Sequence, residues 1–151
     1  MNKNIKKRVV GYIRVSTLEQ ANEGVSLDNQ RNKIKMYCEL NGLELIDTIP
    51  DEGKSGKDLK REGMQKLITL AESKAIDGVV VYKFDRLTRK TRDLLYLVED
   101  VFVKNDIAFY SLTENIDTTT AQGKFFLTIM GAMAQIERDL ISERTCDALQ
   151  Y

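Results

Sequence analysis

The residues best suited to chemistry in this sequence are a serine and a set of charged side chains that follow two apolar runs. Arg14 and Ser16 stand at the end of the run Val9–Thr17. A second run, Gly78–Tyr82, is followed by four charged residues: Lys83, Asp85, Arg86 and Arg89. A serine hydroxyl is a nucleophile, and arginine donates paired hydrogen bonds to phosphate while staying charged at any working pH. These residue types indicate phosphoryl transfer without imidazole, because the chain has no histidine.

The charges of the chain are balanced in total but unevenly distributed. Net charge is zero, with 23 basic and 23 acidic residues, which argues against a generic nucleic-acid binder. Residues 1–14 nevertheless carry five basic groups and no acid, and residues 83–92 carry five against one. Such local patches suit a domain that touches phosphate at one place. The sequence has no carboxylate cluster typical of a metal site, so we expect no metal or other cofactor.

Alternating strand and helix patterns must position these residues. Strands are predicted over 9–17, 43–49, 78–82 and 107–112, and helices over 26–41, 62–75 and 92–104. This order predicts an α/β fold with a mainly parallel four- to five-stranded sheet and helices on both faces. Ligands collect beyond the carboxyl ends of parallel strands, so the charged segments should converge there.

Two further residues lie where they could support this edge. Ser26 is a plausible N-cap of the first helix, which Gly42 would end, and Gln30 in its first turn faces back toward the loop 18–25. Arg61 lies at the exit of a second loop, predicted over 51–62.

A long helix is predicted from about residue 122 to the end of the sequence. Its roughly 28 residues would span about 42 Å, and its first half carries a series of apolar residues: Phe125, Phe126, Ile129, Met130, Met133 and Ile136. We expect it to overhang the domain and to pack against another subunit or DNA, with Glu137 and Arg138 joining the charged site. The predicted organisation is an α/β core over 1–121 and the helix over 122–151, in a fragment of a longer protein.

Each candidate also has a plainer interpretation. A serine after a strand is usually a turn or cap residue, and Asp85 beside Arg86 could form a simple salt bridge. Glu137 and Arg138 could belong to an exposed i,i+4 ladder. A solvated helix start would explain DRLTR less well, because its cations oppose the helix dipole.

Composition and cysteine usage indicate a cytoplasmic protein without membrane contact. The apolar fraction is 42% and the charged fraction 30%, as in soluble globular domains. Arg14 interrupts the N-terminal apolar run too early for a signal peptide, and no stretch approaches about 18 apolar residues. Cys38 and Cys146 lie far apart on helical patterns and are interpreted as small apolar residues in a reducing compartment.

Taken together, several segments resemble the catalytic domain of the serine recombinases, the family of resolvases, invertases and large serine integrases. The matching segments are YIRVS (12–16), SLDNQ (26–30), SGKDLKR (55–61), VYKFDRLTR (81–89) and GKFFLTIMGAMAQIERDLISER (123–144). The resemblance covers about Arg8 to Arg144. The long stretch between Ser16 and Gln30 is more similar to the large integrase and transposon branch than to the small resolvases.

The resemblance implies a role for each matching residue. Ser16 would attack the scissile phosphate of DNA and hold one end through a 5′-phosphoserine bond. The arginines that bind and stabilise this phosphate would be Arg14, Arg86 and Arg89. The residues that orient the nucleophile and these arginines would be Gln30, Arg61, Lys83 and Asp85. Glu137 and Arg138 would belong to the helix that forms the dimer interface and crosses the DNA.

The family also implies tetramers that exchange DNA ends without ATP or metal, and DNA-recognition domains that would lie beyond this chain. Two other functions are weighed against this one. A DNA-docking and oligomerisation module, inactive as an isolated fragment, fits the same residues. A receiver-like or phosphatase domain fits the fold but would place clustered acids where Arg14 and Ser16 stand. The general base stays open between a carboxylate, an arginine and water, as does the oligomeric state.

Overall fold

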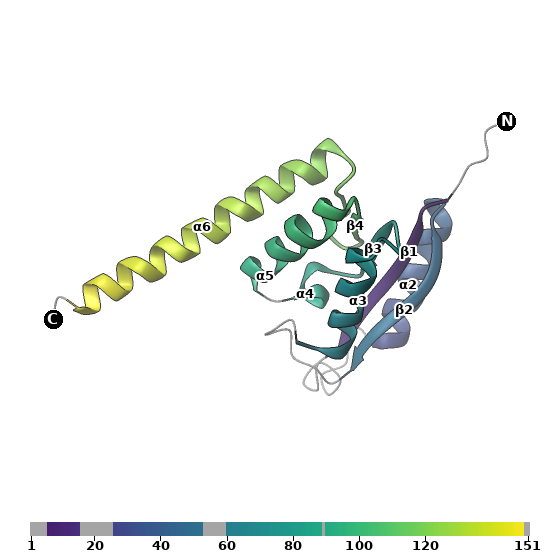
Figure 1. The fold of residues 1–151 in the computed structure, drawn as a ribbon, viewed down its shortest axis with the longest axis horizontal. Helices are drawn as coiled ribbons and strands as arrows, with labels where there is room; N and C mark the ends of the chain where they lie inside the picture. The colour runs from purple at the N-terminus through teal and green to yellow at the C-terminus, as the bar shows by residue number, and fades with distance from the viewer. Residues whose placement is uncertain (1–5, 16–25, 53–59, 89, 150–151) are drawn as a thin grey trace.

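The computed structural model describes residues 6–15, 26–52, 60–88 and 90–149 (Figure 1). Its centre is one five-stranded sheet in the order β2-β1-β3-β4-β5. The strands are β1 (Arg8–Val15), β2 (Glu44–Glu52), β3 (Gly78–Val81), β4 (Ala108–Ser111) and β5 (Ile116–Asp117). The first four strands run parallel, and β5 is antiparallel to β4. The prediction of a mainly parallel α/β sheet is confirmed.

Helices cover both faces of this sheet. On one face, α2 (Leu27–Leu40) packs its buried Ile34 and Cys38 against Val9 and Ile13. The other face packs against α3 (Glu62–Glu72) and a helical stretch made of α5 (Thr91–Tyr96), the π-helix η1 (Leu97–Phe102) and the 3-10 helix η2 (Val103–Asn105). Side chains alternate along a strand, so β1 contributes to both cores.

The end of β2 differs from its predicted position. The sequence indicated a strand ending at Ile49 and a loop over 51–62, but the strand continues through Pro50 to Glu52. Proline lacks the N–H that a central strand needs, and β2 tolerates it because β2 is an edge strand paired only with β1. As a result, Asp51 lies in the sheet and is buried.

The segment after β3 also differs from the prediction. The helix predicted over 92–104 is present as the stretch α5–η1–η2, but a separate four-residue helix, α4 (Phe84–Leu87), precedes it. Four residues are too few to produce a periodic apolar pattern, which is why the sequence did not reveal α4. This short helix carries Arg86 directly beyond β3.

The long C-terminal helix is present as predicted. Helix α6 (Ala121–Leu149) passes α5 and extends away from the sheet (Figure 1). It begins close to β5, since a Cβ atom on Gly123 would overlap the carbonyl oxygen of Asp117. Among the described helices, α6 included, none has the length and apolarity needed to cross a membrane.

Candidate active site

Arg14 is the buried centre of the candidate site. It lies near the carboxyl end of β1, and its side chain has no solvent exposure. Its Nε donates a hydrogen bond to the carbonyl oxygen of Arg86 at 3.2 Å, and its own carbonyl oxygen lies 3.5 Å from Arg86 Nη1. The segments after β1 and β3 therefore meet, as expected for neighbouring parallel strands.

Gln30 connects α2 to the same strand end. Ser26 begins this helix by accepting a hydrogen bond from the Asn29 N–H at 3.1 Å, which confirms the predicted cap. In the first turn, Gln30 is fully buried and bonds twice to the backbone of Arg14. The Arg14 N–H donates to Gln30 Oε1 at 3.3 Å, and Gln30 Nε2 donates to the Arg14 carbonyl oxygen at 3.1 Å. Gln30 thus fixes the backbone of Arg14.

Two arginines from other parts of the chain donate hydrogen bonds to carbonyl oxygens of helix α4. Arg14 donates to the carbonyl oxygen of Arg86, and Arg61 Nη2 donates to the carbonyl oxygen of Leu87 at 2.6 Å. Arg61 and Arg86 are themselves almost fully buried. Three guanidinium groups from separate segments are therefore linked through one turn of helix. Fixed positive charges of this kind, placed at the carboxyl edge of a parallel sheet, are suited to binding a phosphate group.

A buried triad that the sequence did not predict supports Arg61. The Tyr12 hydroxyl donates to Asp51 Oδ2 at 2.6 Å, and Arg61 Nε donates to the Tyr12 oxygen at 3.1 Å while lying 3.6 Å from Asp51 Oδ2. Burial raises the pKa of Tyr12 well above its usual value, against the opposing effect of the Arg61 charge. The phenol therefore stays protonated and acts as a donor to the carboxylate.

Asp51 also fixes the start of α3. Its carboxylate accepts hydrogen bonds from the N–H groups of Gly63 at 2.9 Å and Met64 at 3.1 Å. Glycine is needed at 63 because a Cβ atom there would lie 2.8 Å from the carboxylate atoms. Two signals could have revealed the triad: Tyr12 shares the strand face of Arg14, and Asp51 follows a predicted strand at the same sheet edge.

The structure describes the remaining predicted site residues only in part. Ser16 and Arg89 lie outside the described residues, as does the side chain of Asp85. Lys83 is the N-cap position of α4 and makes no capping hydrogen bond with its side chain.

The two candidates on α6 are exposed. Arg138 donates to Gln135 Oε1 at 2.6 Å, one turn earlier on the same helix. Among the described residues, neither Arg138 nor Glu137 contacts the buried arginines, because α6 leads away from the sheet. Their role at the site stays a prediction.

Alkaline pH is expected to destabilise the fold through two buried groups, the Cys38 thiol of α2 and the Tyr110 phenol of β4. Burial raises the pKa of the Cys38 thiol to about 11 and that of Tyr110 to about 12, with the charge of Asp117 adding to the shift of Tyr110. Both groups ionise more readily when unfolded, so the stability they add below about pH 9 is lost as pH rises further. The free energy of unfolding in urea should fall between about pH 9 and pH 12. Cys38→Ala should show a shallower fall, and identical slopes would contradict this assignment.

The fold and the site define an α/β domain that gathers buried arginines at the carboxyl ends of β1 and β3 and continues into a long projecting helix. The family model described as "Resolvase, N terminal domain" matches residues 9–151, and the chain belongs to this family.

Several relatives and solved structures are similar over most of the chain. A DNA-invertase of Enterobacteria phage P7 is 43% identical over 137 residues, which cover 91% of the chain and 66% of that protein. The Transposon Tn917 resolvase of Enterococcus faecalis is 34% identical, covering 94% of the chain and 69% of the resolvase. The N-terminal catalytic domain of TP901-1 integrase is 52% identical with a TM-score of 0.83, covering 89% of the chain and 98% of that structure. The chain thus spans about two thirds of the length of the invertase.

Proposed function

We propose that this chain is the catalytic domain of a serine site-specific DNA recombinase. The observation that carries the proposal is the arginine cluster itself: Arg14, Arg61 and Arg86 are buried together at the strand edge. Ser16 follows β1 directly in the sequence. Membership of the resolvase family and the 52% identity to an integrase catalytic domain support the same function.

The reaction would be a reversible exchange of phosphodiester bonds. The Ser16 oxygen forms a bond to phosphorus, the bond from phosphorus to the 3′ oxygen breaks, and the departing oxygen takes up a proton. The product is a 5′-phosphoserine linkage and a free 3′ hydroxyl. Attack by the 3′ hydroxyl of a second DNA end reverses the step, so the bond energy is conserved and no ATP is needed.

In this proposal the guanidinium groups stabilise the negative charge that spreads over the non-bridging phosphate oxygens. Arg14 and Arg86 bind these oxygens together with Arg89, while Gln30 and Arg61 hold the arginines in place. Asp85 and Lys83 orient the nucleophile. The expectation that the reaction needs no metal remains a prediction. A protein acting on chromosomal or mobile DNA would work in the cytoplasm.

The test is to trap the covalent intermediate. The chain is incubated with a nicked duplex that cannot religate, both alone and fused to a sequence-specific DNA-binding domain that raises its local concentration on the DNA. Mass spectrometry of the digested adduct should place the phosphoryl group on Ser16. DNA binding without any adduct in either form would instead favour the docking and oligomerisation module.

Oligomerisation through α6 is the second part of the proposal. Its exposed apolar side chains recur every three or four residues and form the α6 stripe: Phe125, Ile129, Met133, Ile136 and Leu140. This spacing places them on one side of the helix, where a second copy of α6 would cover them. Such a contact excludes water from side chains that are 41 to 64% exposed in the isolated chain.

A charge within the α6 stripe is expected to break the oligomer. Met133→Glu would place a carboxylate in an apolar contact, and the mass from light scattering should fall to that of a monomer. Ser142→Glu is the matched control, because Ser142 is exposed on another side of α6 and should leave the mass unchanged. A monomeric parent chain, or equal masses for parent and Met133→Glu, would contradict the proposed interface.

A further inference from the structure

Glu114 holds the first residue of α4 in place from a distant part of the chain. Its Oε1 accepts a hydrogen bond from the Phe84 N–H at 2.8 Å and a second one from the Ser111 hydroxyl at 3.2 Å. The free N–H groups in the first turn of a helix usually donate to a Ser, Thr, Asp or Asn side chain at the N-cap. The N-cap of α4 is Lys83, whose ammonium group has no acceptor atom. Glu114, thirty positions after Phe84, supplies the missing acceptor.

The turn that carries Glu114 is itself tied to the entrance of α4. The N–H and hydroxyl of Thr113 both donate to the carbonyl oxygen of Tyr82, at 3.0 and 2.8 Å. Asn115 closes the turn with its N–H bonded to Leu112 at 3.1 Å, and it adopts a positive φ of 53°. The backbone on both sides of Lys83 is thus fastened to residues 113 and 114. This leaves α4 little freedom to shift relative to β4.

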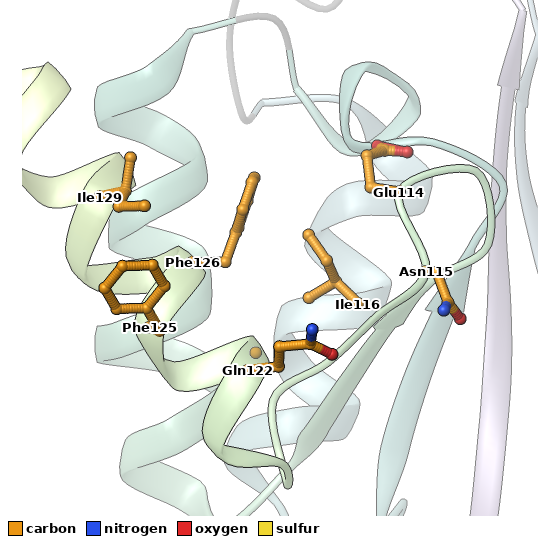
Figure 2. Close-up of a pocket in the computed structure, with 8 residues that line it drawn as sticks. Glu114, Asn115, Ile116, Gln122, Phe125, Phe126 and Ile129 are labelled. Atoms are coloured by element: carbon orange, nitrogen blue, oxygen red, sulfur yellow. The ribbon is translucent and has the colours of Figure 1, made fainter.

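The side chain of Phe84 adds a second restraint on the same residue. Its ring stacks on Phe109 of β4 and on Phe126 of α6, with centroids 5.5 and 5.0 Å apart. Figure 2 shows Glu114 and Phe126 on the walls of one pocket of about 350 Å³, which lies between α6 and the turn at 114–116. The start of α4 therefore contacts β4, the 113–115 turn and the long helix.

Helix α4 is also the place where the arginines of the candidate site meet. Arg86 is part of α4, and the carbonyl oxygens of Arg86 and Leu87 accept the side chains of Arg14 and Arg61. A shift of α4 would move all three guanidinium groups relative to one another. Misplacement of catalytic groups by about 1 Å costs up to about a hundredfold in rate.

We propose that Glu114 is a positioning residue for DNA cleavage, which holds α4 so that Arg14 and Arg86 face one phosphate while Arg61 supports them. It does not touch the substrate and acts through the Phe84 N–H. This inference rests on the proposed recombinase function and adds to it a residue outside the arginine cluster. The contact that carries this role is the one between Oε1 and the Phe84 N–H, since Oε2 makes no hydrogen bond with a described residue.

Three substitutions separate this geometry from charge and from general stability. Glu114→Gln keeps an oxygen at the Oε1 position and should retain cleavage within about threefold of the parent. Glu114→Asp keeps the charge but falls one methylene short, and Glu114→Ala removes the acceptor. Both should slow adduct formation by about 10- to 100-fold, with DNA affinity changed by less than about threefold, since the arginines remain. Glu72→Ala, an exposed change at the end of α3, is the matched control and should behave as the parent.

Amide hydrogen exchange at Phe84 tests the contact independently of activity. Protection of this N–H should survive in Glu114→Gln and be lost in Glu114→Asp and Glu114→Ala. If the parent forms no adduct, the recombinase proposal fails, and the exchange pattern alone decides whether Glu114 holds α4. Cleavage by Glu114→Ala at the parent rate would overturn the positioning role. An equal loss of cleavage rate in Glu114→Gln and Glu114→Ala would overturn it as well.

Discussion

Replacing Ser16 with alanine is expected to abolish covalent attachment of the chain to DNA. The alanine methyl group offers no oxygen to phosphorus, so no phosphoester can form. Loss of a catalytic serine lowers rates by more than about 10⁴-fold in serine enzymes. Affinity for an uncut duplex should stay within about threefold, because the arginine cluster is unchanged. Denaturing gel electrophoresis of a labelled nicked duplex measures the adduct, and a binding assay on intact DNA measures the affinity.

A second serine provides the control for this experiment. Ser73 ends α3, is exposed, and donates its hydroxyl to the Leu70 carbonyl oxygen. Ser73→Ala removes the same atom from the chain and should form adducts at the parent rate. Adducts that persist in Ser16→Ala would assign the nucleophile to another residue and would remove the basis of the proposed mechanism.

The regular elements could be predicted because their local patterns are strong. The run Gly78–Tyr82 is β-branched without interruption, and β3 is buried on both faces. Helix α2 has its start marked by Ser26 and its end by Gly42, whose positive φ of 67° ends the helix. The charged residues that follow such strands were then placed at one edge by topology alone, and Arg14 and Arg86 indeed meet there.

The contacts made by the supporting residues of the site could not be predicted in this way. Asp51 follows Pro50 in a polar stretch, and only the edge position of β2 keeps it in the sheet. The sequence pattern predicts only that Tyr12 is an aromatic residue of the core. Its hydroxyl bonds to Asp51, which lies 39 positions further along the chain. Glu114 lies in a short turn with no periodicity, and its partner Phe84 is 30 positions earlier. Local patterns carry no information on such contacts, because distant segments decide them.

The largest change in stability is expected from Asp51→Ala. The substitution removes the acceptor of the Tyr12 hydroxyl and of two α3 amides, and it takes a carboxylate from beside the buried Arg61 guanidinium. Removing one member of a buried ion pair costs about 3–5 kcal/mol, because the other charge loses its compensation. Urea unfolding followed by circular dichroism measures this loss. Single domains are stable by only about 5–15 kcal/mol, so a sizeable fraction of the variant should be unfolded at moderate urea concentrations.

Asp47→Ala tests whether burial is the cause of this effect. Asp47 lies on the same strand and pairs with Lys66 at 3.8 Å, but both side chains are more than half exposed. Exposed pairs contribute about 0–1 kcal/mol, so this change should be small. Equal losses for Asp47→Ala and Asp51→Ala would show that β2 responds to any lost charge and not to the triad. A large loss of stability for Asp51→Ala, with a smaller one for Tyr12→Phe, would assign the energy to the contacts that hold Arg61. Arg61 in turn bonds to the carbonyl oxygen of Leu87, so these contacts fix the C-terminal end of α4.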